Sequence, residues 1–150
     1  MRHVCTALVF AILFVTATGC AHVPYAISDD DRSRFGKDLI VVHLPGHNDP
    51  LILGASGCKL YRARIEHQDI VGWEVTLAAD WGAPAYPQFM TGCMRESLAW
   101  DGTYVKVYFC ALAFGAGGGC TNGGYYRSRT GTRPWWISDD GLHAWTVLPR

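Results

Sequence analysis

The C-terminal part of the chain contains a ten-residue pattern that occurs twice in tandem. Each copy has an aromatic residue, a Ser, a Thr or Asp followed by Gly, and a Trp. The two copies are Tyr126, Ser128, Thr130, Gly131 and Trp135, then Trp136, Ser138, Asp140, Gly141 and Trp145. Ser and Asp side chains hydrogen-bond the backbone of tight turns, and Gly supplies the positive φ that such turns need. The pattern therefore predicts two successive turns and a three-stranded antiparallel meander from Tyr125 to Leu148.

The second copy of this pattern resembles the Asp-box, the S-x-D-x-G-x-x-W hairpin of sialidases and other β-rich proteins. Its Gly141 stands one position earlier than in that motif. In those families the Asp-box stabilises the fold at a distance from the catalytic site. The resemblance thus implies β architecture and says nothing about chemistry.

The N-terminus has the composition of an export signal. Met1, Arg2 and His3 precede an apolar run, residues 4–18, that is too short to serve comfortably as a membrane anchor. The sequence Ala17-Thr18-Gly19-Cys20 resembles the lipobox of bacterial lipoproteins, although Ala17 replaces the usual Leu.

The lipobox resemblance implies that Cys20 is acylated. Cleavage by an ordinary signal peptidase, leaving Cys20 as a free thiol, is the alternative. We predict a signal peptide over residues 1–19, a lipidated tether over 20–37 that has room for one short helix, and a single domain over 38–150. Ala21 follows the cysteine where an inner-membrane retention signal has Asp, which favours the outer membrane, with the domain facing the periplasm.

The cysteines fit an oxidising compartment. Cys5 leaves with the signal and Cys20 takes the lipid, so an even set remains: Cys58, Cys93, Cys110 and Cys120. Four cysteines permit three pairings. We favour Cys110 with Cys120, which closes a Gly-rich loop, and Cys58 with Cys93. Zinc binding is the rival interpretation, but there is no C-x-x-C pair and the spacings are wide.

Alternating apolar and polar residues predict strands along most of the domain. Residues 59–66 and 71–77 alternate on both sides of a short polar turn, and we place Val71, Trp73, Val75 and Leu77 on one buried face. Asp101 and Gly102 predict the turn of a second hairpin. Residues 38–44 and 51–53 read as two further strands. We expect a mainly β fold, an antiparallel sheet domain arranged as a sandwich or a partly open barrel, with disulfides.

Charge and aromatic content limit the kinds of partner that the protein can bind. The chain has 13 basic and 13 acidic side chains, so no basic field is available to attract nucleic acid. All 6 Trp and 7 Tyr lie after the signal, more than a small core needs, and exposed aromatic side chains favour binding surfaces.

Four residues are candidates for contact with a protein partner. Trp81 and Tyr86 lie in a long loop, residues 78–91, and Arg62 and Arg64 lie on the charged face of the first hairpin. The alternatives are aromatic side chains folded back over the core and a merely solvated sheet face.

Motifs for metal and cofactor binding are weak. His43, His47 and Asp49 lie close together in sequence, but a Pro-Gly turn with polar neighbours explains them without a metal. The Gly-rich residues 115–124 lack the Gly-Lys-Ser/Thr of a phosphate-binding loop. We expect no metal site and no cofactor.

Motifs for catalysis are equally weak. Ser56 lies in Gly-Ala-Ser-Gly, which lacks one spacer residue of the nucleophile elbow. We therefore expect no catalytic residue. The enzyme alternative is a hydrolase of glycans or peptidoglycan that uses Asp80 and Glu96.

The lipobox-like start, the four mature cysteines and the terminal S-x-D-G-x-x-x-W together resemble the immunity lipoproteins that protect bacteria from antibacterial effectors of type VI secretion. This resemblance implies a lipid-anchored periplasmic module that binds and inhibits an effector enzyme. The alternative is a structural or accessory lipoprotein of an envelope assembly.

Overall fold

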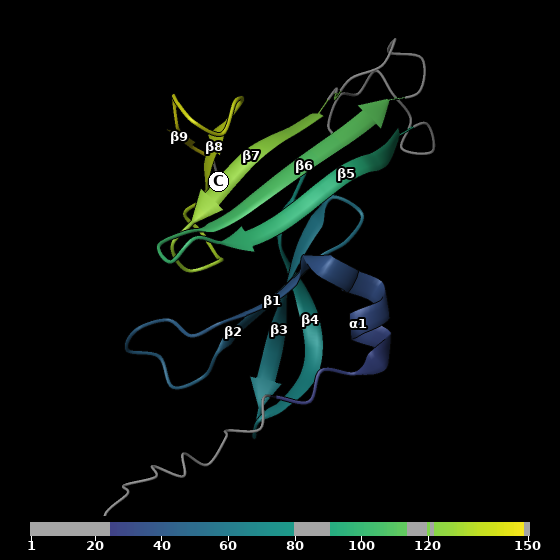
Figure 1. The fold of residues 1–150 in the computed structure, drawn as a ribbon, viewed down its shortest axis with the longest axis vertical. Coiled ribbons are helices and arrows are strands. Elements are labelled where there is room, and N and C mark those ends of the chain that lie inside the picture. Colours follow the sequence, from purple (N-terminus) through teal and green to yellow (C-terminus); the bar gives the residue numbers. More distant parts are fainter. Residues whose placement is uncertain (1–24, 80–90, 114–119, 121, 149–150) are drawn as a thin grey trace, which may run out of the picture.

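The computed structural model describes residues 25–79, 91–113, 120 and 122–148. One short helix and a 3₁₀ turn precede two antiparallel sheets (Figure 1). The elements are α1 (Asp29–Phe35), η1 (Gly36–Asp38), β1 (Leu39–Val42), β2 (Leu51–Ala55), β3 (Lys59–Glu66), β4 (Asp69–Ala78), β5 (Thr91–Trp100), β6 (Val105–Ala113), β7 (Asn122–Ser128), β8 (Trp136–Ser138) and β9 (Thr146–Val147).

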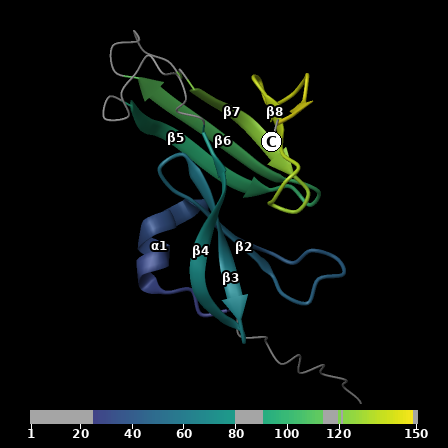
Figure 2. The ribbon, with the colours of Figure 1, turned by 180° about the vertical axis from the view of Figure 1, so that it is seen from behind.

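Each sheet is a meander in which every strand pairs with the next strand of the sequence. The N-terminal sheet has the order β1-β2-β3-β4, and the C-terminal sheet has the order β5-β6-β7-β8-β9. Figures 1 and 2 show, from opposite sides, that the C-terminal sheet lies across one end of the N-terminal sheet. The strands β7, β8 and β9 confirm the meander that the tandem pattern predicts.

Both sheets contribute to one hydrophobic core. The buried residues of the core are Val42, Leu51, Leu53, Ala55, Cys58, Leu60, Leu77 and Ala79 before β5, and Leu98, Val105, Val107, Phe109, Ala111, Tyr126 and Trp135 from β5 onward. We call the core-facing side of each sheet its inner face. Two sheets packed on a shared core form a sandwich, which confirms the predicted mainly β fold.

Helix α1 covers the outer face of the N-terminal sheet. Phe35 is only 3% exposed, and its ring lies 4.6 Å from the ring of Trp73. The ring packs directly on β2 at Gly54, where a Cβ atom would lie 2.5 Å from the Phe35 ring. The expected tether thus does contain a short helix, and the folded part of the chain begins before residue 38.

A β-bulge changes which side chains of β4 face the core. Leu60 pairs with Leu77, but the next residue, Tyr61, pairs with Val75, so Thr76 is an extra residue in β4. As a result Leu77 is 4% exposed, whereas Val75 lies on the outer face and is 52% exposed. The prediction that both residues share one buried face is wrong, because strict alternation ignores the inserted residue.

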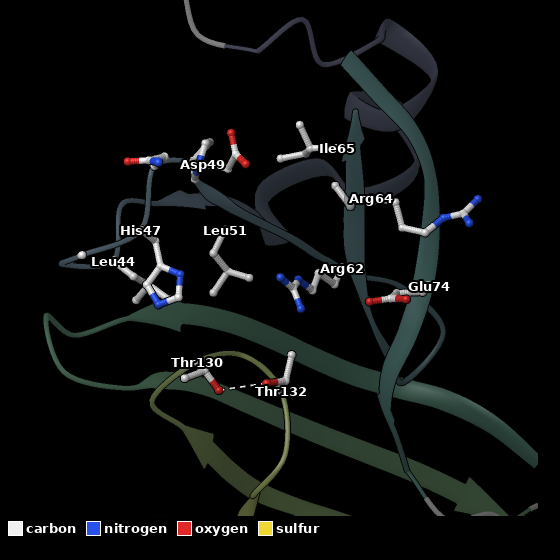
Figure 3. Close-up of a pocket in the computed structure, with 14 residues that line it drawn as sticks. Leu44, His47, Asp49, Leu51, Arg62, Arg64, Ile65, Glu74, Thr130 and Thr132 are labelled. Carbon is white, nitrogen blue, oxygen red and sulfur yellow. Dashed lines mark hydrogen bonds between the residues drawn. The ribbon is translucent and has the colours of Figure 1, made fainter. Parts of the chain in front are cut away.

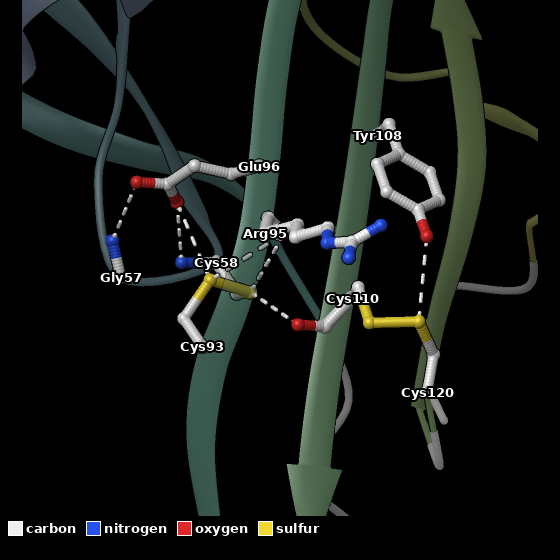
Figure 4. Close-up of a disulfide and its surroundings, with 8 residues drawn as sticks. All are labelled: Gly57, Cys58, Cys93, Arg95, Glu96, Tyr108, Cys110 and Cys120. Atoms are coloured by element: carbon white, nitrogen blue, oxygen red, sulfur yellow. Dashed lines mark hydrogen bonds between the residues drawn. A yellow bond between two sulfur atoms is a disulfide. The ribbon is translucent and has the colours of Figure 1, made fainter. Parts of the chain in front are cut away.

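Two disulfides staple the sandwich (Figure 4). Cys58, in the turn between β2 and β3, is bonded to Cys93 of β5 and so joins the two sheets. Cys110 of β6 is bonded to Cys120, just before β7. Both favoured pairings are confirmed. Structural disulfides are typical of proteins in oxidising compartments, so the structure indicates an exported protein.

The part of the chain that the structure describes contains no helix with the length and apolar character needed to cross a membrane.

Candidate functional site

An open groove of about 720 Å³ lies over the N-terminal sheet. We call it the arginine groove. It lies between the β1–β2 loop, strands β3 and β4, and a turn that follows β7. Its lining residues are Leu44, Gly46, His47, Asn48, Asp49, Pro50, Leu51, Arg62, Ala63, Arg64, Ile65, Glu74, Thr130 and Thr132.

The register of the sheet explains why Arg62 faces this groove. Arg62 pairs with Leu53, a fully buried core residue, so both side chains leave the same face of the sheet. Arg64 follows two positions later on the same strand. The charged face predicted from alternation in β3 therefore lines the groove, with Glu74 of β4 directly across from Arg62.

The two arginines take different directions. Figure 3 shows the Arg62 guanidinium pointing toward Leu51 in the groove, while Arg64 points away from it. Arg64 lies over Gly72 of β4, where a Cβ would be 3.0 Å from its Nη2. Both side chains are exposed, and among the described residues neither has a carboxylate within 4.0 Å. Their charges are thus available to a partner.

The opposite wall is the turn of the first sequence repeat, residues 128–132, which we call the first-repeat turn. Buried Ser128 accepts a hydrogen bond from the Thr130 N–H at 3.3 Å and donates one to the Thr132 carbonyl at 2.5 Å. The hydroxyls of Thr130 and Thr132 are 2.9 Å apart. Gly131 has φ +68° and packs so closely that a Cβ would lie 2.9 Å from Leu51. The tandem pattern thus positions two hydroxyls at the groove.

The β1–β2 loop supplies the third side. The Tyr25 hydroxyl donates to Asp49 Oδ1 at 3.0 Å, and partial desolvation together with this carboxylate raises the pKa of Tyr25. His47, two residues before Asp49 in the same loop, also lines the groove.

The structure does not assemble the metal cluster that was considered for His43, His47 and Asp49. Within the described ranges, the ligand atoms that gather within 4.8 Å of one another belong to Cys58, Cys93 and Glu96. The two sulfurs of that group are joined as a disulfide and are not thiolate ligands.

Glu96 instead stabilises a turn (Figure 4). Its carboxylate accepts hydrogen bonds from the backbone N–H of Gly57 at 3.3 Å and of Cys58 at 2.8 Å. Ser56 is the first residue of this hairpin turn, and its backbone exchanges hydrogen bonds with the backbone of Lys59. Asp80, the second carboxylate of the hydrolase alternative, lies outside the described residues, as do Trp81 and Tyr86.

The groove combines the Arg62 guanidinium and the hydroxyls of Thr130 and Thr132 with two carboxylates, Asp49 and Glu74. Guanidinium groups carry a planar fork of N–H donors that matches carboxylate and phosphate oxygens. Sequence analysis identified Arg62 and Arg64 but missed Thr130 and Thr132. Both threonines lie in the tandem pattern, but the pattern does not indicate that its first turn packs against the N-terminal sheet.

Comparisons of the chain with protein-family models, with curated proteins and with solved structures gave no significant match. The resemblance to immunity lipoproteins stays a prediction that depends on the sequence features alone.

Proposed function

We propose that this chain is an exported binding module that inhibits a partner protein, and that it serves as an immunity lipoprotein against an antibacterial effector enzyme. It acts in the periplasm, held to the outer membrane through acylated Cys20. The observation that carries this proposal is the arginine groove, where Arg62 and Arg64 stand on a rigid sheet without an ion-pair partner among the described residues.

The frame around the groove favours binding. Arg62 projects from a part of β3 that is paired on both sides and Arg64 from a part paired with β4, and the Cys58–Cys93 disulfide fixes the turn at the start of β3. A preformed surface loses little conformational entropy when a partner docks. Effector hydrolases that work through Asp or Glu present carboxylates, and guanidinium groups pair well with these.

Competition between strains tests the biological role. A strain that lacks the gene should be killed by sibling cells that deliver the cognate effector, and a plasmid copy of the gene should restore survival. Equal survival of the deletion strain and its parent against every neighbouring effector would exclude the immunity role.

Charge reversal tests the groove. The double variant Arg62→Glu/Arg64→Glu should fail to protect the deletion strain, because a negative groove repels an acidic partner surface. Lys59→Glu is the matched control, since Lys59 is an exposed cation of β3 that does not line the groove. Full protection by the double variant, with melting temperatures alike in all three proteins, would mean that the partner binds elsewhere.

The anchor has a separate test. Cys20→Ser should abolish incorporation of labelled palmitate and move the protein from the membrane fraction to the soluble periplasm. Labelling that persists in this variant would contradict acylation at Cys20.

A further inference from the structure

The outer face of the C-terminal sheet carries a second cationic group that the proposed function does not use. Arg127 of β7 lies between two aromatic rings: its Cζ is 4.8 Å from the centroid of Tyr104 and 4.2 Å from that of Trp145. Arg129 lies beside the same tyrosine, with its Cζ 5.6 Å from the ring and its Nη2 3.4 Å from the hydroxyl. We call Tyr104, Arg127 and Arg129 the Tyr104 cluster.

The described part of the chain provides no ion-pair partner for this positive charge. Among the described residues, neither guanidinium of the cluster has a carboxylate within 4.0 Å, and the buried Nε of Arg127 has no hydrogen-bond partner. The neighbouring acid, Asp101, is engaged by Lys106, with Nζ and Oδ2 2.8 Å apart.

The pKa of Tyr104 reflects the positive charge of these arginines. The Arg129 hydrogen bond and the charges of Arg129 and Arg127 lower the pKa of Tyr104, although partial desolvation and Asp101 act in the opposite direction. The Tyr104 hydroxyl thus lies in a net positive environment, and this environment would stabilise an anion bound beside it.

The Tyr104 cluster and the arginine groove adjoin the same turn. Arg129 directly precedes Thr130, and Thr130 and Thr132 line the groove. Arg129 turns instead toward the Tyr104 hydroxyl. Cationic side chains from both sheets therefore flank the first-repeat turn.

We propose that the partner-binding surface extends from the arginine groove across the first-repeat turn to the Tyr104 cluster, and that it takes an acidic segment of a protein. This inference rests on the proposed binding function and adds the chemistry of the partner. The guanidinium groups of Arg62, Arg127 and Arg129, none of which is ion-paired among the described residues, call for Asp or Glu side chains, which they bind with paired hydrogen bonds.

The packing favours a protein segment over a glycan. Sugars bind aromatic surfaces by stacking on open ring faces, but Arg127 occupies one face of Tyr104 and one face of Trp145. The rings act to hold the guanidinium in place, so that fewer rotamers are lost when a carboxylate binds.

A titration with a defined probe tests this surface. The probe is a peptide of about twelve glutamates, which can extend over about 40 Å. Binding to the purified mature protein is measured by calorimetry at low salt. We expect saturable binding that Arg62→Glu and Arg129→Glu each weaken by about tenfold, the effect of losing one charge-assisted hydrogen-bonded pair.

Arg95→Glu is the matched control, because Arg95 is an exposed cation of the same sheet outside the Tyr104 cluster, and it should change the affinity by less than about twofold. Melting curves establish that each variant is folded. Equal weakening by Arg95→Glu and Arg129→Glu would overturn the proposal in favour of diffuse attraction, and so would an absence of binding. Tighter binding of polygalacturonate than of the peptide would assign the surface to an acidic glycan instead.

The two proposals can fail separately. If the deletion strain survives every effector but the glutamate peptide binds as expected, the acidic-segment surface stands and the immunity role falls. If the protein protects cells and Arg129→Glu protects equally well, the immunity role stands and the extension to the Tyr104 cluster falls.

Discussion

The serines of the tandem pattern show how much one side chain can organise. Ser138 accepts a hydrogen bond from the Gly141 N–H at 3.1 Å and donates to the His143 carbonyl at 2.6 Å, much as Ser128 does in the first copy. The second copy adds Asp140, whose Oδ1 accepts from the N–H groups of Leu142 and His143 at 2.8 Å. These hydrogen bonds hold the pKa of Asp140 well below its usual range. Local turn chemistry of this kind is readable from sequence, which is why both turns were predicted.

Replacing Ser128 by Ala tests how much one buried hydroxyl contributes to stability. We expect Ser128→Ala to lower the free energy of unfolding by about 1–3 kcal/mol, because the Thr130 N–H and the Thr132 carbonyl lose the buried Ser128 hydroxyl as their partner. Urea denaturation gives the value. Ser97→Ala, at an exposed position of β5, serves as the control and should change stability by less than about 0.5 kcal/mol. Equal losses in both variants would contradict the role of Ser128.

Asp101 should contribute stability that depends on pH. Lys106 and the backbone N–H groups of Tyr104 and Thr103 lower the pKa of Asp101 to about 2. In the unfolded chain the value is about 3.9, so the folded state favours the charged carboxylate. This stabilisation is present above about pH 4 and is lost as the pH falls to about 2.

The variant Asp101→Asn should therefore melt at a lower temperature than the unmodified protein at pH 7, and the difference should vanish near pH 2. Circular dichroism melting curves between these values give the result. Lys106→Met removes the largest single contribution and should retain part of the pH dependence. A gap in melting temperature that is the same at every pH would rule out this linkage.

At the scale of elements, the turn between β2 and β3 joins the two halves of the molecule. Gly57 and Cys58 have φ of 64° and 54°, and Ser56 and Lys59 exchange backbone hydrogen bonds of 3.0 and 3.3 Å, the pattern of a type I′ hairpin turn. Glu96 of β5 binds both amides of the turn. The carboxylate and the Cys58–Cys93 disulfide thus fix the same turn to the opposite sheet.

We expect Glu96→Ala to destabilise the protein by about 1–3 kcal/mol, because it leaves the N–H of buried Cys58 without its acceptor. Glu66→Ala, at the exposed end of β3, should have an effect below about 0.5 kcal/mol. Chemical denaturation of both variants with the disulfides intact is the measurement. A Glu96 variant as stable as the Glu66 variant would show that the disulfide alone holds the turn.

Strand positions were predictable because alternation is local, whereas the prediction failed where contacts between distant parts of the chain decide the structure. The bulge at Thr76 depends on two demands that lie on different faces: Leu77 must meet the core beside Leu60, while Trp73 must meet Phe35 of α1. Neither demand is visible within β4 itself. The contact between Glu96 and Cys58 spans 38 residues and was likewise out of reach of a pattern argument.

At the scale of the whole molecule, the sandwich consists of two successive meanders. Contacts of β1, β2 and η1 with β5, the shared core, the Cys58–Cys93 disulfide and the Glu96 hydrogen bonds tie the two sheets together. Arg62 and Arg64 could be placed on one face by their spacing, but the wall opposite them comes from Thr130 and Thr132, in the other sheet's connecting turn. For this reason, only the β3 side of the groove could be predicted from the sequence.

The disulfides should differ in their contribution to stability. Cys58 and Cys93 are 35 residues apart and join the sheets, whereas Cys110 and Cys120 are 10 apart within one sheet. Loop-closure entropy predicts losses of about 4 and about 3 kcal/mol when each pair is replaced by serine. Urea denaturation of the two double variants checks the order. A larger loss for the Cys110–Cys120 pair would mean that strain or residual structure, and not chain entropy, sets the values.

Under the proposed function, the residues that bind the partner differ from the residues that hold the fold together. Positions 47, 62 and 64 lie outside the buried core, whereas the cysteines, Glu96 and the two repeat serines hold the sheets and turns in place. If the proposed function holds, substitutions at these exposed positions can change the partner that is bound without destabilising the fold. Sister proteins with other targets should then diverge first along β3 and the β1–β2 loop.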